Sequence, residues 1–406
     1  MSGGGSGRRP RIGLIWTQFS AYHVDRLEAV GRRLSDRVDV VAIEVASTST
    51  TYAWEPSGAV RNTEKRQIFP GEAYERIPFF RRFRGQLREL ARCDAVFVGV
   101  AYSNPDIILI ALILRLLGKP VVMMTASKFD DHPRSALKEW LKAQLLSCFS
   151  SAIVGGGRQH DYVRFLGFRA RRVLPGYNTV CMERVRRQAA EAGASSDYPF
   201  AQRSFVYVGR FVAKKNIETM LEAYAVYAHG AGERARRLTM VGDGPLDAAL
   251  HAQCAELGIA HLVDFTGFLT SAQVSATLAQ GLALVLVSGE EQWGLVINEA
   301  LAVGLPVIAS FEVGAREALV RNLLNGCLVQ SGSIESIARA FAYVAHDEPR
   351  WQAMAWHSRE RAWLADSERF ADAVELMVFP GQEPAATDHA RFAEAVLVEA
   401  SSMDAA

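Results

Sequence analysis

Short, continuous apolar runs alternate with segments of helical periodicity along most of this 406-residue sequence. Residues 11–16, 95–100 and 205–208 are such runs. Between runs of this kind lie segments such as 217–228, in which apolar residues recur at the spacing of one helix face. Strands that are apolar throughout are buried on both sides, which is typical of parallel sheets connected by helices. The alternation therefore predicts an α/β chain built from βαβ units.

The alternation stops once and then resumes, which predicts two Rossmann-like, doubly wound parallel-sheet domains. The interruption contains several arginines and then an Ala/Gly/Ser/Asp stretch before Pro199, which we interpret as a linker. The predicted parts, in chain order, are a flexible tail (1–10), a first domain (11–182), a linker (183–200), a second domain (201–366), a terminal helix (367–379) and a tail (380–406).

Charge is distributed unevenly between the two halves. Residues 1–200 contain 30 Lys and Arg against 19 Asp and Glu, whereas residues 201–406 contain 15 against 25. This asymmetry predicts that the two domains meet different ligands. The five cysteines are scattered without a C-x-x-C pair, so we expect no disulfide framework and a cytoplasmic location. The most apolar stretch, residues 107–117, is too short to cross a bilayer.

Two loops of the second predicted domain carry residues that suit a phosphorylated ligand. Gly209, Arg210 and Lys215 follow a predicted strand, where glycine permits close backbone approach and two cations could bind a diphosphate. A solvated basic loop is the alternative. A tight turn before a helix is sufficient to explain the sequence Gly-Asp-Gly-Pro at 242–245.

The segment 288–299 contains the strongest pattern. Gly294 and Leu295 begin a predicted helix, whose free N–H groups and dipole favour an anion. Glu299 follows about 7–8 Å along the axis, a position suited to a ribose hydroxyl, and Glu291 would face a sugar beyond the phosphates. The alternative is that Glu299 pairs with a cation and Glu291 is solvated. Two carboxylates could also indicate a glycosidase, but their placement around one helix N-terminus favours one extended ligand.

Taken in order, these motifs resemble the donor half of the GT4 (group 1) family of retaining glycosyltransferases. Phe265-Thr266-Gly267 and the segment 304–308 add to the match, which extends over residues 205–326. The resemblance implies a GT-B fold, with two domains facing a cleft. It also implies transfer of a sugar from a nucleotide diphosphate-sugar to an acceptor hydroxyl, with no cofactor and no metal, in polysaccharide or glycoconjugate synthesis.

The resemblance also assigns roles to individual residues. Arg210 and Lys215 would stabilise the departing diphosphate, and Glu291 would position the donor sugar. These three are the implied catalytic residues. The residues implied to bind the donor nucleotide-sugar are Gly209, Gly294, Leu295 and Glu299.

The first predicted domain resembles the family less closely. No Gly pair follows its first strand, and the segment 125–131 lacks the histidine that the family places there. A subset of GT4-like sequences shares its other motifs, from which we expect His23, Ser127 and Lys128 on the acceptor side. The alternative is that His23 caps its helix and Lys128 is solvated. The expected acceptor is a glycan, a lipid-linked sugar or a small molecule.

The run from Arg76 to Arg92 contains six arginines and three phenylalanines. This composition suits an anionic membrane surface, so we expect peripheral docking on the inner face of the membrane. An ordinary solvated helix is the alternative, and no recognised motif indicates a nucleic-acid partner.

Two other functions remain open. The chain could be a catalytically silent binding subunit with the same fold, or a nucleotide-sugar epimerase. The sequence identifies neither the base and sugar of the donor nor the acceptor.

Overall fold

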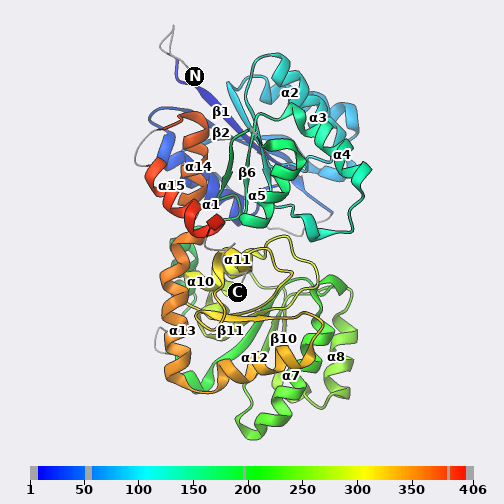
Figure 1. The fold of residues 1–406 in the computed structure, drawn as a ribbon, viewed down its shortest axis with the longest axis vertical. Helices are drawn as coiled ribbons and strands as arrows, with labels where there is room; N and C mark the ends of the chain where they lie inside the picture. The colour runs from blue at the N-terminus through cyan, green and yellow to red at the C-terminus, as the bar shows by residue number, and fades with distance from the viewer. Residues whose placement is uncertain (1–7, 51–56, 170, 195–197, 382–384, 399–406) are drawn as a thin grey trace. The chain divides into compact units, whose positions relative to one another are not determined.

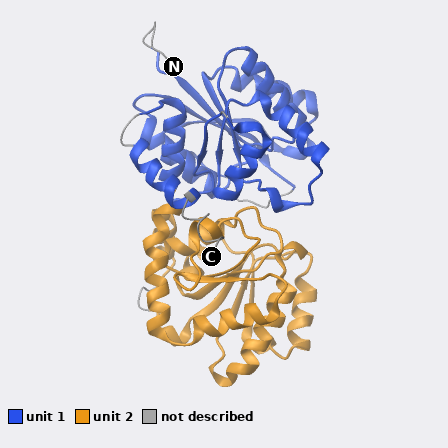
Figure 2. Ribbon diagram, viewed as in Figure 1, with its two compact units in different colours: residues 1–181, 367–406 blue, residues 182–366 orange. Residues whose placement is uncertain are grey.

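The chain forms two compact units, each built around a parallel sheet (Figures 1 and 2). The computed structural model describes residues 8–50, 57–169, 171–194, 198–381 and 385–398. Unit 1 comprises residues 1–181 and 367–406, and unit 2 comprises residues 182–366. The predicted fold class, two Rossmann-like doubly wound domains, is confirmed.

Unit 1 contains, within its described residues, a seven-stranded sheet in the order β3-β2-β1-β4-β5-β6-β7, with every pair parallel. The order reverses between β1 and β4, which makes this the topological switch point of the unit. The strands are β1 (Arg11–Trp16), β2 (Asp39–Thr48), β3 (Glu64–Ala73), β4 (Ala95–Val98), β5 (Val121–Thr125), β6 (Ser151–Val154) and β7 (Val173–Pro175). The α-helices are α1 (Ala21–Leu34), α2 (Phe79–Leu90), α3 (Pro105–Leu116), α4 (Ala136–Leu145), α5 (Gly157–Val163), α14 (Glu368–Val378) and α15 (Ala385–Ala393).

Unit 2 contains a six-stranded parallel sheet, again counted over described residues, in the order β10-β9-β8-β11-β12-β13. Its strands are β8 (Ser204–Val208), β9 (Leu238–Val241), β10 (Val263–Gly267), β11 (Gly281–Leu286), β12 (Val307–Ser310) and β13 (Gly326–Val329). Its α-helices are α6 (Met182–Glu191), α7 (Ile217–Ala231), α8 (Asp247–Glu256), α9 (Ser271–Ala279), α10 (Leu295–Ala302), α11 (Arg316–Leu319), α12 (Ile334–Ala345) and α13 (Glu348–Arg361).

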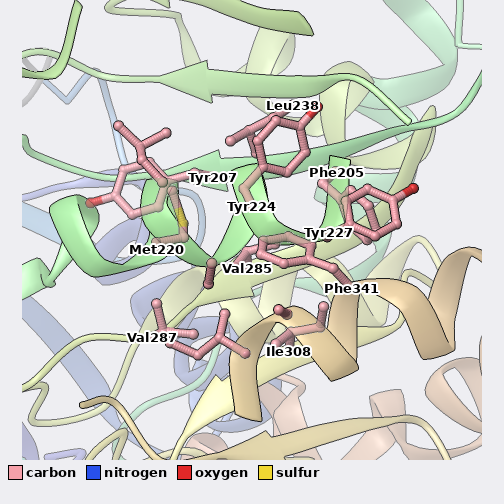
Figure 3. Close-up of a cluster of buried hydrophobic side chains, with 14 of the residues drawn as sticks. Phe205, Tyr207, Met220, Tyr224, Tyr227, Leu238, Val285, Val287, Ile308 and Phe341 are labelled. Atoms are coloured by element: carbon pink, nitrogen blue, oxygen red, sulfur yellow. The ribbon is translucent and has the colours of Figure 1, made fainter. Parts of the chain in front are cut away.

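An aromatic cluster packs helices α7 and α12 of unit 2 against β8 and β11 (Figure 3). The rings of Phe205 and Phe341 meet edge to face, with their centroids 4.7 Å apart. The rings of Tyr224 and Tyr227 both pack against Phe341. Such pairs stabilise by roughly 0.5–1.5 kcal/mol beyond their buried area. The cluster therefore gives the loops at the strand ends a rigid base.

The structure corrects the expected linker and the expected C-terminal tail. Residues 183–200 begin with α6, whose apolar face (Met182, Val185 and Ala189) is buried within unit 2. The tail at 380–406 contains α15, which packs on α14. Residues 1–7, 382–384 and 399–406 of the two expected tails lie outside the described residues.

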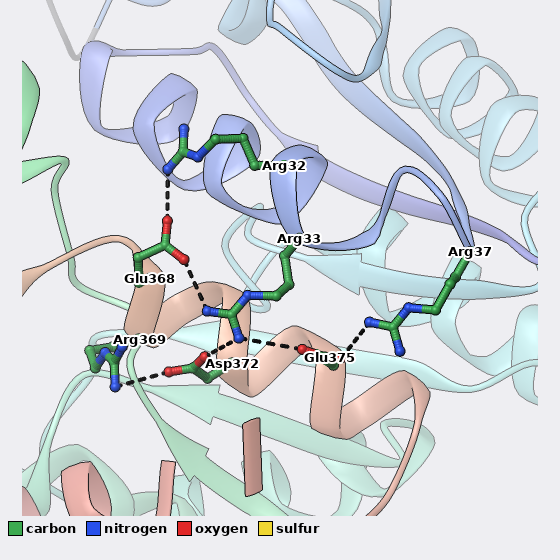
Figure 4. A network of polar contacts seen from close by, with 7 residues as sticks. All are labelled: Arg32, Arg33, Arg37, Glu368, Arg369, Asp372 and Glu375. Atoms are coloured by element: carbon green, nitrogen blue, oxygen red, sulfur yellow. Dashed lines mark hydrogen bonds and ion pairs between the residues drawn. The ribbon is translucent and has the colours of Figure 1, made fainter. Parts of the chain in front are cut away.

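Helix α14, the observed counterpart of the expected terminal helix, is fastened to α1 by charged side chains (Figure 4). Arg33 of α1 lies 2.6 Å from the fully buried carboxylate of Asp372 and 3.0 Å from that of Glu368. We call this set the α1–α14 ion network; its members are Arg32, Arg33, Arg37, Glu368, Arg369, Asp372 and Glu375. No described helix is both long enough and apolar enough to cross a membrane.

Candidate functional site

Strands β8 and β11 are neighbours at the point where the strand order of unit 2 reverses. The connections that follow them run toward opposite edges of the sheet, and doubly wound sheets bind ligands outside the carboxyl ends of their strands at such a point. The segment 209–216 follows β8, and the segment 287–294 follows β11. Most of the predicted donor-side residues lie on these two segments, and Leu295 and Glu299 lie on α10 directly after the second.

An ion pair joins the two segments across the switch point. The Nζ of Lys215 donates to Oε2 of Glu291, although 76 residues separate them in sequence. Each side chain is only 17% exposed, so water screens the pair less than it screens a surface pair. The backbone supports this contact, because the N–H groups of Gly289 and Glu290 donate to the carbonyl of Lys214 at 2.9 and 3.2 Å. The structure thus brings together two of the three residues implied to be catalytic.

Gly294 positions the start of α10 beside this pair. Its φ of +94° is in the left-handed region that favours glycine. A Cβ at this position would lie 2.7 Å from Cδ2 of Leu286, so a side chain would clash there, and 3.5 Å from Cγ of Glu291, which is ordinary contact. Leu295 is the first residue of α10, and Glu299 is buried on the same helix with 3% exposure. Among the described residues, no hydrogen bond or ion pair joins Glu299 to Lys215 or Glu291.

Glycines also let the loops after β8 and β9 touch. A Cβ on Gly242, whose φ is +136°, would lie 1.9 Å from the carbonyl oxygen of Gly209. Beyond Gly209, Arg210 is exposed, and its carbonyl accepts a hydrogen bond from the Tyr207 hydroxyl at 3.2 Å. Burial, and then the charge of Glu291, raise the pKa of Tyr207, which therefore remains a neutral donor. Arg210 lies on the same loop as Lys215, but within the described residues no hydrogen bond or ion pair joins it to Lys215 or Glu291.

The sequence reasoning missed the role of Asn216, which fastens three loops together. Its backbone is left-handed, with φ of +56°, at the start of α7. Its Nδ2 donates to the carbonyl of Val287 at 3.1 Å and to that of Ser331 at 2.7 Å, so the segments after β8, β11 and β13 are joined. An asparagine directly before a helix that follows a strand is a typical capping residue, and this pattern could have indicated its role.

In unit 1, His23 caps α1, which is the alternative interpretation given above. The backbone N–H of Ser20 donates to Nδ1 of His23 at 2.9 Å, and the ring packs against Trp16 with centroids 5.0 Å apart. Burial lowers the pKa of His23 well below its ordinary value, and the positive charge of Arg26 lowers it further. Because Nδ1 accepts, the neutral ring carries its proton on Nε2 and can act there as a donor.

Lys128 is buried rather than solvated. Its side chain is 1% exposed, and its Nζ lies 3.2 Å from carboxylate oxygens of Asp130 and Asp131. The neighbouring Ser127 is half-buried, and its N–H donates to Oγ1 of Thr125 at 3.1 Å. These residues follow β5, whereas His23 follows β1, and β4 lies between the two strands.

Neither unit has an evident metal centre in its described part. No group of three or more His, Cys, Asp or Glu side chains there is arranged to hold a metal ion.

One protein-family model matches this chain, and the matched residues lie in unit 2. Residues 195–361 match the family model for glycosyl transferases group 1. The 2-deoxystreptamine glucosyltransferase of Streptomyces kanamyceticus is 31% identical over 160 residues, or 39% of this chain and 40% of that protein. A GDP-mannose-dependent alpha-(1-6)-phosphatidylinositol monomannoside mannosyltransferase of Mycobacterium tuberculosis is 31% identical over 180 residues, or 42% of this chain and 46% of that one. The chain thus spans less than half of the length of either relative.

Comparison with solved structures covers both units. Sucrose-phosphate synthase from Thermosynechococcus elongatus superposes with a TM-score of 0.68 at 17% identity, covering 91% of this chain and 98% of that one. HepE from Anabaena, in complex with UDP and glucose, gives a TM-score of 0.66 at 16% identity, covering 92% and 100%. These similarities show a shared two-domain fold, as the resemblance implied.

Proposed function

Because residues 195–361 belong to the group 1 family of glycosyl transferases, we propose that this protein transfers a sugar from a nucleotide diphosphate-sugar to an acceptor hydroxyl. The observation that carries the proposal is the Lys215–Glu291 ion pair at the switch point of unit 2. Its cation can bind the diphosphate, and its carboxylate can accept hydrogen bonds from sugar hydroxyls. The named activities of the two relatives, and UDP and glucose in the structure of HepE, support this choice of donor class.

In the proposed reaction, negative charge develops on the diphosphate as its bond to the anomeric carbon breaks. Lys215 is already held at the switch point by Glu291, and Arg210 lies on the same loop. Cations that are preorganised where charge develops lower the barrier without reorganisation. We therefore propose that these two residues do the work that a divalent ion does elsewhere, and that EDTA leaves turnover unchanged.

We further propose that the anomeric configuration is retained without a protein nucleophile. The bond from the anomeric carbon to the diphosphate oxygen breaks, and a bond to the acceptor oxygen forms on the same face. The leaving phosphate takes the hydroxyl proton. NMR of the new glycosidic linkage tests this step, and an inverted anomeric centre would exclude it.

Release of nucleoside diphosphate from UDP-, GDP-, ADP- and dTDP-sugars, with and without an acceptor mixture, tests the activity. Lys215→Met and Glu291→Gln should each reduce release by about 10²–10³-fold, as for loss of one preorganised charged group. Lys214→Met is the matched control. This neighbouring lysine is 56% exposed, and its ion pair with Glu290 is long, at 3.8 Å.

The same assay separates the two alternatives. A silent binding subunit would bind a donor, with a raised melting temperature, and release no diphosphate. An epimerase would convert the donor sugar while the nucleotide remained attached. Release that is equal in Lys215→Met and Lys214→Met would refute the proposed site.

For the acceptor, we propose a lipid-linked molecule reached by docking of unit 1 on an anionic membrane. On α2, Phe80 is 77% exposed, whereas Arg82 of the same run is tied to the buried Asp106 at 2.7 Å. On α3 and α4, Leu116 and Trp140 are 79% and 57% exposed, so apolar contact adds to charge. Co-sedimentation with phosphatidylglycerol vesicles should weaken in Phe80→Ser. Its absence in the unmodified protein would remove this proposal.

A further inference from the structure

A cavity of about 470 Å³ lies in unit 2 at the amino ends of β8, β11 and β12. Arg203 directly precedes β8, Gly281 begins β11, and Leu305 is two residues before β12; all three line the cavity. The strands are parallel, so their amino ends lie at the sheet edge opposite to their carboxyl ends. The cavity is therefore separate from the Lys215–Glu291 site.

The charged lining of the cavity is mostly cationic. Arg186 of α6, Arg203 and Arg359 of α13 face it, against one carboxylate, Glu348. Within the described residues, none of the three guanidinium groups forms an ion pair. Arg186 donates only from Nε to the carbonyl of Ala302 at 2.8 Å, and the side chain of Arg359 makes no hydrogen bond there. The described lining thus carries more positive than negative charge, and Glu348 offsets only part of it.

The burial of Arg203 provides a second indication of a ligand. It is only 6% exposed, and its Nη1 donates to the carbonyls of Ala279 and Gly281 at 3.0 Å each. Its Nε is buried without an acceptor, and its Nη2 donates to none of the described residues. A buried guanidinium without an ion-pair partner is costly, and burial lowers the pKa of Arg203, an effect that the charge of Glu348 offsets only in part.

Aromatic rings next to these arginines narrow the class of ligand. The Arg203 guanidinium lies over the ring of Trp351, 4.4 Å from its centroid, and 5.6 Å from that of Tyr198. Both rings line the cavity. Planar guanidinium forks match phosphate oxygens, and aromatic faces pack on a sugar or a base. The volume is in the range of small-molecule sites and exceeds that needed for an inorganic ion.

We propose that this cavity is a second ligand site, which binds a phosphorylated small molecule of sugar-phosphate to nucleotide size. Its phosphoryl group lies among the three arginines. Arg186 is on α6, with which the chain enters unit 2, and Arg359 is on α13, after which η9 (Ala362–Ala365) leads the chain out. A ligand held by both residues ties the two ends of unit 2 together.

Calorimetric titration of the full chain with glucose 6-phosphate, in phosphate-free buffer, tests the proposal, with glucose as the neutral control. We expect saturable binding of glucose 6-phosphate alone. Arg359→Met and Arg186→Met should each weaken it about tenfold, as for loss of one charged hydrogen bond. Both side chains are exposed, so the variants should fold normally.

Two control variants make the result specific. Arg187→Met, next to Arg186 on α6 but paired with Glu191 at 3.8 Å, should leave the affinity unchanged. Lys215→Met should also leave it unchanged, because that residue lies at the other edge of the sheet. Absence of saturable binding, or loss of binding in Lys215→Met but not in Arg359→Met, would overturn the proposal.

Discussion

Replacing Arg33 with methionine should destabilise unit 1 much more than the same replacement of Arg32, its neighbour on α1. Arg33 lies 2.6 Å from Asp372, whose side chain is fully buried, and also contacts Glu368 and Glu375 of α14. Arg32 is 48% exposed and, among the described residues, forms an ion pair only with Glu368, which is 33% exposed. The two substitutions remove the same charge from the same helix, so they differ mainly in burial.

The burial difference sets the expected free energies of unfolding. Breaking a buried ion pair by removing one partner costs about 3–5 kcal/mol, whereas an exposed pair contributes roughly 0–1 kcal/mol. Arg369 remains 3.1 Å from Asp372 and still compensates part of its buried charge. We therefore expect Arg33→Met to lower the free energy of unfolding by about 3 kcal/mol. For a unit of this size, that corresponds to a melting temperature lower by roughly 6–12 °C, against at most about 4 °C for Arg32→Met.

Differential scanning calorimetry at several pH values provides the measurement. Burial raises the pKa of Asp372 even with both arginines present, and loss of Arg33 raises it further. The folded variant therefore takes up a proton more readily than its unfolded chain, so its deficit in unfolding free energy should shrink as the pH is lowered. Equal melting temperatures for the two variants, or a deficit that does not change with pH, would contradict this reasoning.

Three further predictions concern single positions. Asn216→Ala should lower the stability of unit 2 by about 2–4 kcal/mol in urea unfolding, because two carbonyls lose their donor and alanine is strained at positive φ. Asn216→Gly should regain only the part of the stability that alanine loses through backbone strain. Gly242→Ala should prevent normal folding, seen as proteolysis of unit 2, because its Cβ would overlap the Gly209 carbonyl; Gly230→Ala, with open space around it, should be tolerated. The pKa of His23 is lowered by burial, so stability should fall as the pH drops through about 6.5, by up to ~1.4 kcal/mol per pH unit, and His23→Gln should flatten this slope in thermal scans.

Each of these predictions has a clear contrary result. Identical unfolding curves for Asn216→Ala and Asn216→Gly would show that backbone strain contributes nothing there. Protease resistance of Gly242→Ala equal to that of Gly230→Ala would contradict the close approach of the two loops. An unchanged pH slope in His23→Gln would mean that other groups titrate in its place.

The sequence predicted β1, β4 and β8 because each is mainly an apolar run, but it did not predict the short strands β7 and β13. It missed β3, whose residues are largely polar and include Pro70, because an edge strand paired only with β2 need not be apolar. It also missed α6, although Met182, Val185 and Ala189 carry a helical spacing there. The arginines and the glycine-containing stretch that follows outweighed this signal in our interpretation.

The candidate site was predictable in its residue types and less so in its contacts. Strand ends rich in glycine, lysine and glutamate indicated Lys215 and Glu291. Their meeting depends on β8 and β11 being neighbours, which is a property of strand order and is not encoded by any local pattern. The support from Asn216 and the burial of Lys128 likewise arise from long-range packing.

Because unit 2 interrupts unit 1 in sequence, the two units are completed at different times during synthesis. The strands of unit 1 are made first, but α14 follows only after residues 182–366 have been made. At about 5–20 residues per second, this delay is roughly 10–40 s. Throughout that interval the arginines of α1 lack their carboxylates, and the apolar residues under α14 are uncovered. Unit 2 is contiguous and can fold as it leaves the ribosome, so we expect nascent unit 1 to be the species that chaperones hold.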